Sequence, residues 1–180
     1  GDAGFITSAV LRDLIKPSLA DTALVQNLFI SSGAHQLSIA SDVDLSIISG
    51  NPVNKLQTIT LQGANIVFNA NLIAGDRNAV TSANVKLSTA GQITHTAGHI
   101  ITNILTLEKV GAAVNFGGAG FIHVGVLNSL IKGGVNSRVR ELVIKGQGID
   151  VAGDVDLGDI SNAAGLSKVT LDSNAAITRT

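Results

Sequence analysis

A short apolar pair, two aliphatic residues separated by one other residue, recurs along most of this chain of 180 residues. The seven copies are Val43–Leu45, Ile59–Leu61, Val85–Leu87, Leu105–Leu107, Val124–Val126, Leu142–Ile144 and Val169–Leu171. Their first residues lie 16, 26, 20, 19, 18 and 27 positions apart, a mean of 21. Residues i and i+2 share one face of a β-strand, and strands returning at a fixed period are typical of stacked coils. The pattern therefore predicts an all-β protein, a parallel β-helix (β-solenoid) of about 20 residues per coil.

The residues after each pair support the same fold. A polar or glycine pair follows, and then a second apolar strand: Gln62-Gly63 leads to Ile66–Phe68, and Lys145-Gly146 leads to Ile149–Val151. This order predicts a strand, a corner and another strand in each coil. Only 3% of the residues are aromatic, which suits the narrow interior of a solenoid, where small aliphatic side chains stack and Asn or Thr can form ladders at the corners. A β-sandwich with antiparallel hairpins is the alternative.

The N-terminal segment, residues 1–35, has a different pattern from residues 36–180, which we assign to the solenoid. Val10, Leu11, Leu14 and Ile15 recur at helical spacing before Pro17, and Ser18–Asp21 matches a capping box for a second helix through Leu28. One interpretation is a helical cap over the open strand edges of the first coil. In the other, Ala23–Ile30 is simply the first strand. Weak helical periodicity also returns at Val126–Lys132, where we expect an insertion into one coil.

Composition excludes several classes of protein. No apolar run approaches the ~20 residues that cross a bilayer, so we expect no membrane insertion by this segment. The net charge is −1, and the nearest basic cluster (Lys132, Arg138, Arg140, Lys145) contains Glu141, so we expect no nucleic-acid partner. The absence of Cys excludes disulfides and thiolate chemistry.

Two groups of residues have the chemistry of a binding or catalytic site. His95 and His99 are four positions apart, but on a strand they would lie ~13 Å from each other, too far for one metal ion. Asp150, Asp154, Asp156 and Asp159 form the acidic cluster, preceded by Gly146-Gln-Gly148, which resembles one imperfect copy of a calcium-binding repeat. Paired carboxylates on a β-helix can also process polysaccharides, with Arg138 and Arg140 as possible partners. Gly117–Gly120 lacks the Lys of a phosphate loop and predicts a turn. We assign no catalytic, cofactor-binding or metal-ligating residue.

The repeated pairs, the Asn-, Gly- and Thr-rich corners and the scarcity of aromatics together resemble the passenger domain of an autotransporter. The resemblance is to the rickettsial surface cell antigen family, and it covers residues 36–180. The segments that show it best are Leu56–Asn65, Val151–Gly158 and Leu166–Asn174.

This resemblance implies a right-handed β-helix that belongs to a larger exported chain and is displayed on the bacterial cell surface or secreted. It further implies a structural and adhesive role in host-cell attachment, with an unidentified host surface protein or glycan as partner, and no enzymatic activity or cofactor. The alternative function is a glycan-binding or polysaccharide-processing β-helix that uses the Asp150–Asp159 face.

Overall fold

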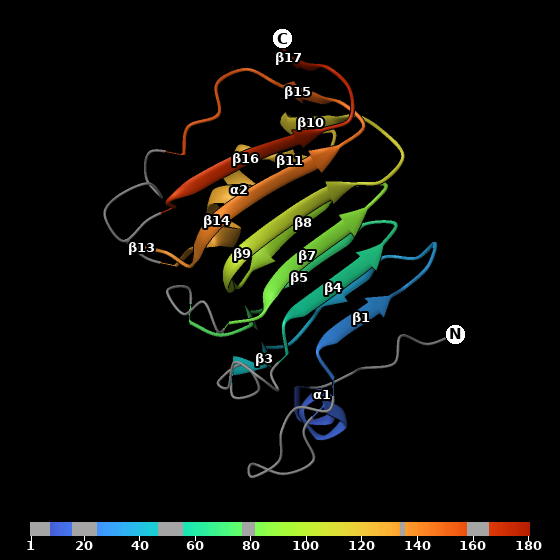
Figure 1. Cartoon of the computed structure of the whole chain (residues 1–180), viewed down its shortest axis with the longest axis vertical. Coiled ribbons are helices and arrows are strands. Elements are labelled where there is room, and N and C mark those ends of the chain that lie inside the picture. Colours follow the sequence, from blue (N-terminus) through green and yellow to red (C-terminus); the bar gives the residue numbers. More distant parts are fainter. Residues whose placement is uncertain (1–7, 16–24, 47–55, 77–81, 134–135, 158–165) are drawn as a thin grey trace.

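The computed structural model describes residues 8–15, 25–46, 56–76, 82–133, 136–157 and 166–180. Within them the chain is mostly β-structure in parallel sheets, with two helices of eight residues, α1 (Ser8–Ile15) and α2 (Val124–Ile131) (Figure 1). Neither of these helices has the length that a membrane span requires. The expected capping box at Ser18–Asp21 lies outside the described residues, as does Asp159.

The largest sheet contains eight strands, six of which follow one another side by side in chain order. These six are β1 (Asn27–Ser31), β4 (Thr58–Gly63), β7 (Asn84–Thr89), β9 (Ile100–Lys109), β14 (Val139–Gly146) and β16 (Lys168–Ser173). The short strands β3 (Val43–Asp44) and β6 (Leu72–Ile73) pair with each other, and β6 also pairs with β9. All pairings in this sheet, which we call the long sheet, are parallel.

Two further parallel sheets are formed by the strands that follow each corner. One contains β2 (Leu37–Ile39), β5 (Ile66–Asn69) and β8 (Ile93–Ala97). The other runs β11 (Ile122–His123), β10 (Val114–Gly117), β15 (Ile149–Val151) and β17 (Ile177–Arg179). Among the described strands, only β12 (Lys132–Gly133) and β13 (Asn136–Ser137) pair antiparallel. The alternative of an antiparallel sandwich is therefore wrong, because the sheets are parallel.

Five of the seven apolar pairs lie in the six successive strands of the long sheet and stack in register. The first residues form one column, in which Ile59, Val85, Leu105, Leu142 and Val169 are successive partners. The second residues form the neighbouring column from Leu61 to Leu171. All members from β4 to β14 are buried, and burying an aliphatic side chain of this size stabilises the fold by roughly 1.5–3 kcal/mol. The pattern thus identified the interior of the sheet.

The other two pairs do not belong to this column, so the spacing of the repeat is corrected: Val43–Leu45 is buried as expected but in another strand, and the prediction of a strand at Val124–Val126 is wrong. Val43–Leu45 begins in β3, outside the six-strand series, and Val124–Val126 begins helix α2. The missing member is Leu28–Ile30 of β1, which lies opposite Ile59–Leu61. In-register residues are 28, 59, 85, 105, 142 and 169, so the intervals are 31, 26, 20, 37 and 27 residues. The repeat is longer and less regular than the predicted 20.

The N-terminal segment contains both of the expected elements. Helix α1 forms where Val10, Leu11, Leu14 and Ile15 predicted it, and it buries Leu11 and Ile15. The second helix does not reach Leu28, because Leu28 lies in β1 and pairs with β4. The long sheet therefore begins N-terminal to the expected boundary at residue 35.

The longest interval, between β9 and β14, contains an insertion. After β10 the chain turns back, and the amide of Ile93 donates to the carbonyl of Phe121 at 2.9 Å, so this segment lies beside β8. Helix α2 follows and buries Leu127, Leu130 and Ile131. The structure confirms the helical periodicity expected near residues 126–132.

Candidate functional site

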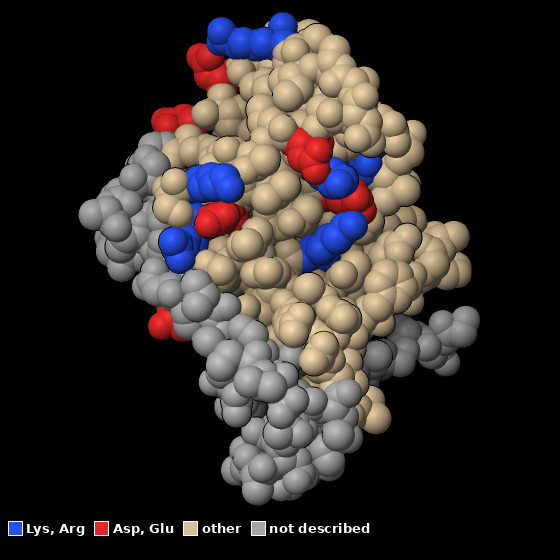
Figure 2. Space-filling model, viewed as in Figure 1, with Lys and Arg blue, Asp and Glu red and all other residues tan. Residues whose placement is uncertain are grey.

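The outer face of the long sheet carries ion pairs that link neighbouring strands (Figure 2). Lys86 pairs with Glu108 at 2.8 Å, Lys145 with Asp172 at 3.1 Å, and Lys168 with Glu141 at 3.8 Å. In one column Glu108, Lys145 and Asp172 are successive partners, so the sign of the charge alternates from strand to strand. Exposed pairs of this kind each contribute little to stability, but together they fix the order of charges on the face.

Two of these charged groups have shifted pKa values. Partial burial acts to raise the pKa of Glu108, but the hydrogen bonds from Lys86 and Ser88 and the charges of Lys86 and Lys145 outweigh it and lower the pKa. The hydrogen bond and the charge of Asp172 raise the pKa of Lys145. Both shifts favour the charged forms of Glu108 and Lys145.

The N-terminal part of the same face has a different character. Over β1 and β4 the outward residues are Asn27, Phe29, Ser31, Thr58, Thr60 and Gln62, and Figure 2 shows no charged side chain there. Phe29 is 61% exposed although it lies on a strand. The Thr58 hydroxyl donates to Asn27 at 2.6 Å, which fixes the polar side chains beside it. We call the outward residues of β1 and β4 the neutral strip.

Two carboxylates of the acidic cluster bind side chains at the C-terminal end of the chain, on or next to β17. Asp150 accepts hydrogen bonds from the hydroxyls of Thr178 and Thr180, at 3.0 and 2.8 Å. Arg179 donates to Asp154 at 2.7 Å. The structure therefore brings β15 and β17 together around Asp150 and Asp154, and these carboxylates bind residues that sequence spacing did not connect to them.

The arginines considered as partners of this cluster lie elsewhere. Arg140 is on β14 in the long sheet and Arg138 immediately precedes that strand, whereas Asp150 is on β15 in another sheet. No group of three potential metal ligands occurs among the residues that the structure describes. Asp150 and Asp154 thus form contacts with the last strand of the kind that hold a sheet edge together.

Both histidines are bonded to backbone carbonyls. His95 Nε2 lies 2.6 Å from the oxygen of Gly98, and His99 Nδ1 lies 3.0 Å from the oxygen of Ser129 in α2. A carbonyl can only accept, so each of these ring nitrogens carries a proton and is not available as a metal ligand. Gly117–Gly120 forms the end of β10 and the turn after it, as expected.

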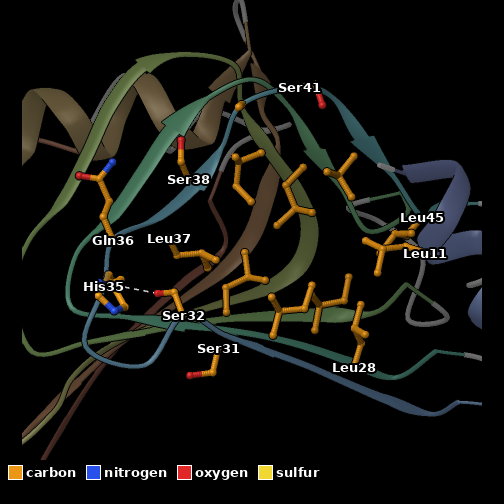
Figure 3. A pocket seen from close by; sticks show the side chains of 17 residues that line it. Leu11, Leu28, Ser31, Ser32, His35, Gln36, Leu37, Ser38, Ser41 and Leu45 are labelled. Atoms are coloured by element: carbon orange, nitrogen blue, oxygen red, sulfur yellow. Dashed lines mark hydrogen bonds between the residues drawn. The ribbon is translucent and has the colours of Figure 1, made fainter. Parts of the chain in front are cut away.

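A cavity of about 610 Å³ lies at the N-terminal end of the stacked strands (Figure 3). Its walls are mainly aliphatic and come from β1, β2, β3, β4, β6 and α1. Leu11, Leu28 and Leu45 lie at one end, while Ser31, Ser32 and His35 lie at the corner between β1 and β2. The Ser32 hydroxyl donates to the backbone oxygen of His35 at 2.7 Å, so Ser32 and the His35 ring are not paired as nucleophile and base.

Sequence reasoning missed the neutral strip and the cavity. Both depend on which strand is the first of the stack, and the sequence fits either a strand at Ala23–Ile30 or a helix from the Ser18–Asp21 capping box through Leu28. The one available signal was the pair Leu28–Ile30, which has the same spacing as the other pairs.

Comparisons with known proteins gave no relative. No family model matches the chain, and neither a curated protein nor a solved structure does.

Proposed function

We propose that this chain is a surface-exposed structural and adhesive module, a right-handed parallel β-helix of the autotransporter passenger type that attaches bacteria to host cells. The observation that carries this proposal is the register of six parallel strands from β1 to β16. Parallel strands lie ~4.8 Å apart, so five steps give a sheet face about 24 Å tall. A β-strand that returns parallel to itself in one sheet follows a right-handed path in nearly all proteins, which supports the proposed hand.

The neutral strip around Phe29 is the part of this face that we assign to host contact. Interfaces are enriched in aromatic side chains and depleted of charge at their centres. Phe29 is such an aromatic, and neutral hydrogen-bonding residues surround it. The partner is a host surface protein or glycan, and the charged part of the face above the strip sets the orientation of the complex.

Adhesion of the purified protein to cultured host cells tests this proposal. We expect saturable binding that Phe29→Ala weakens about tenfold or more, as loss of a buried aromatic anchor does. Val110→Ala is the matched control, since Val110 is also an exposed apolar residue but lies in the turn after β9. Antibody labelling of intact bacterial cells tests surface display. Absence of binding by the wild-type protein contradicts the adhesive role and indicates that the module acts only as a structural spacer.

Two substitutions in the acidic cluster distinguish the adhesive module from the glycan-processing alternative. Asp154→Ala and Asp156→Ala change the acidic face but leave the neutral strip intact. Adhesion that survives both changes supports the adhesive module. Binding to a glycan array that is lost specifically in these variants overturns it in favour of the alternative.

A further inference from the structure

The neutral strip is small compared with a protein interface. Its outward residues run from Asn27 to Ser31 on β1 and from Thr58 to Gln62 on β4. At ~3.3 Å per residue and ~4.8 Å between strands, it presents a surface of about 13 by 10 Å, or about 130 Å². A stable protein–protein interface takes about 800 Å² from each partner. The strip is therefore small for a protein partner and large enough for a short oligosaccharide.

Charged side chains border the strip where β7 follows β4. Lys86 lies opposite Thr60 in the sheet, and its ammonium group pairs with Glu108 at 2.8 Å. Ser88 lies opposite Gln62 and also donates to Glu108, at 2.9 Å. A carboxylate or sulfate on a ligand would have to compete with Glu108 for the ammonium group of Lys86. This border therefore favours an uncharged ligand on the strip.

Phe29 gives the strip an exposed aromatic ring. It lies between Asn27 and Ser31 on β1 and opposite Thr60 on β4, and it is 61% exposed. The face of an aromatic ring carries partial negative charge and attracts groups that carry partial positive charge. A pyranose ring has several such C–H groups on one face. It can therefore stack on Phe29 while its hydroxyl groups reach the polar side chains around the ring.

Hydrogen bonds within the strip hold polar groups on both sides of Phe29. On one side the Thr58 hydroxyl donates to the side-chain oxygen of Asn27 at 2.6 Å, so the amide nitrogen of Asn27 can donate to a ligand. On the other side Ser31 Oγ accepts from the amide of Gly33 at 3.1 Å, and its hydroxyl proton can be donated. Sugar hydroxyls both donate and accept. Side chains that are already held lose little conformational freedom when they bind them.

We infer that the neutral strip binds an uncharged oligosaccharide of the host cell surface, with one pyranose ring stacked on Phe29 and its hydroxyls bound by Asn27, Thr58 and Ser31. This inference rests on the adhesive role proposed above and names the chemical class of the partner. Glycans that are recognised through sialic acid or sulfate do not fit, because none of the outward residues of the strip is cationic. The glycan lies on the long sheet and not on the acidic cluster.

Two substitutions of Phe29 separate ring stacking from simple apolar contact. Binding of the purified protein is measured on an array of neutral, sialylated and sulfated oligosaccharides. We expect the wild-type protein to bind neutral members, Phe29→Leu to weaken this binding by about tenfold, and Phe29→Tyr, which keeps the ring, to retain it. Val110→Ala is again the control. A folded Phe29→Leu variant that binds as well as the wild-type protein, or binding confined to acidic glycans, overturns the inference.

Asn27→Asp tests the hydrogen-bond donor beside the ring. A carboxylate still accepts the hydroxyl of Thr58, but it cannot donate to a sugar and it brings a charge to the strip. We expect neutral glycan binding to fall by about tenfold. Asn174→Asp is the matched control, since Asn174 is exposed in the turn after β16 and binding should not change. Circular dichroism establishes that each variant is folded, and unchanged binding by folded Asn27→Asp overturns the proposed site.

Adhesion to treated host cells separates this inference from the adhesive role. Periodate cleaves the vicinal diols of sugars, whereas sialidase removes only sialic acid. We expect adhesion to be lost after periodate treatment and to survive sialidase. Adhesion that still depends on Phe29 after periodate treatment overturns the glycan as partner and supports the adhesive role. Binding to neutral glycans on the array without adhesion to cells supports the glycan site and contradicts the adhesive role, and absence of both overturns both.

Discussion

Gly98 lies at a corner where the backbone itself leaves no room for a side chain. Its φ is +81°, and a Cβ at this position would overlap the backbone of Ala70 on the preceding strand layer. Gly111 has a similar φ of +72° but has no atom close to the position of a Cβ. A side chain at Gly111 would therefore cost stability only through the unfavourable φ, whereas a side chain at Gly98 would cost stability through both the φ and the steric overlap with Ala70.

We expect Gly111→Ala to lower the free energy of unfolding by about 1 kcal/mol and Gly98→Ala by about 3 kcal/mol or more. Only the second change must also move two layers of backbone apart. Urea denaturation of both variants measures the difference. Equal losses in the two variants would show that the corner is not tightly packed.

Asp42 forms the first member of a corner ladder. It accepts hydrogen bonds from the backbone amide of Asn71 at 2.8 Å and from the Asn71 side chain, and Asn71 in turn accepts from the amide of His99 at 3.0 Å. The backbone bond is the largest cause of the lowered pKa of Asp42, and the side-chain bond is the next. Sequence patterns predicted such ladders at corners but not which residues form them, because the members of this ladder are 29 and 28 positions apart in the chain.

The lowered pKa gives a pH dependence of stability. The folded pKa lies below the unfolded value of 3.8, so the contribution of Asp42 is complete above that pH and is lost as the pH falls through the folded pKa. Asp42→Asn should slightly lower the free energy of unfolding at pH 7, because the charge-assisted bonds become neutral ones, but the effect is small because solvent screens this exposed carboxylate. The loss of stability as the pH falls below about 4 should become shallower. Urea unfolding at a series of pH values checks this, and parallel curves for the two proteins would contradict it.

At the level of the strands, five of the apolar pairs identified the long sheet correctly. The prediction of a strand at Val124–Val126 was wrong. Leu127, Leu130 and Ile131 continue the pair at helical spacing, and burial of these side chains stabilises helix α2 there. Leu28–Ile30 was ambiguous for the opposite reason, since only pairing with β4 distinguishes it from a helix. A period of two over three residues is too short a pattern to decide between strand and helix without the neighbouring strands.

The acidic cluster shows the same limit for the candidate site. Polar and apolar residues alternate in Asp154–Leu157 as they do in a strand with one exposed face, yet the structure has no strand there. Thr178, Thr180 and Arg179 lie 25 to 30 positions from the carboxylates that they contact. Each carboxylate and its partner lie on successive strands of the stack. Because the intervals between strands are irregular, the sequence alone does not show which residues come into contact.

The central strand β9 allows a direct measurement of what the interior columns contribute. Leu105 is fully buried between Val85 and Leu142, so Leu105→Ala should lower the free energy of unfolding by about 2–5 kcal/mol. Thr106→Ala, the next residue on the outer face of the same strand, should cost less than about 1 kcal/mol. Thermal and urea unfolding of the two variants measure the contrast. Similar losses would indicate that the inner and outer faces have been assigned wrongly.

For the whole molecule, a stack of strands predicts a gradient of local stability. Among the strands that the structure describes, those in the middle, such as β9, have a neighbour on both sides, whereas β1 and β16 each have one. In such a nearest-neighbour arrangement the ends open with less free energy than the centre. Hydrogen exchange followed by mass spectrometry should therefore find the slowest amides in β7, β9 and β14, and faster exchange towards both ends. Uniform exchange across all six strands, from β1 to β16, would contradict this gradient of local stability.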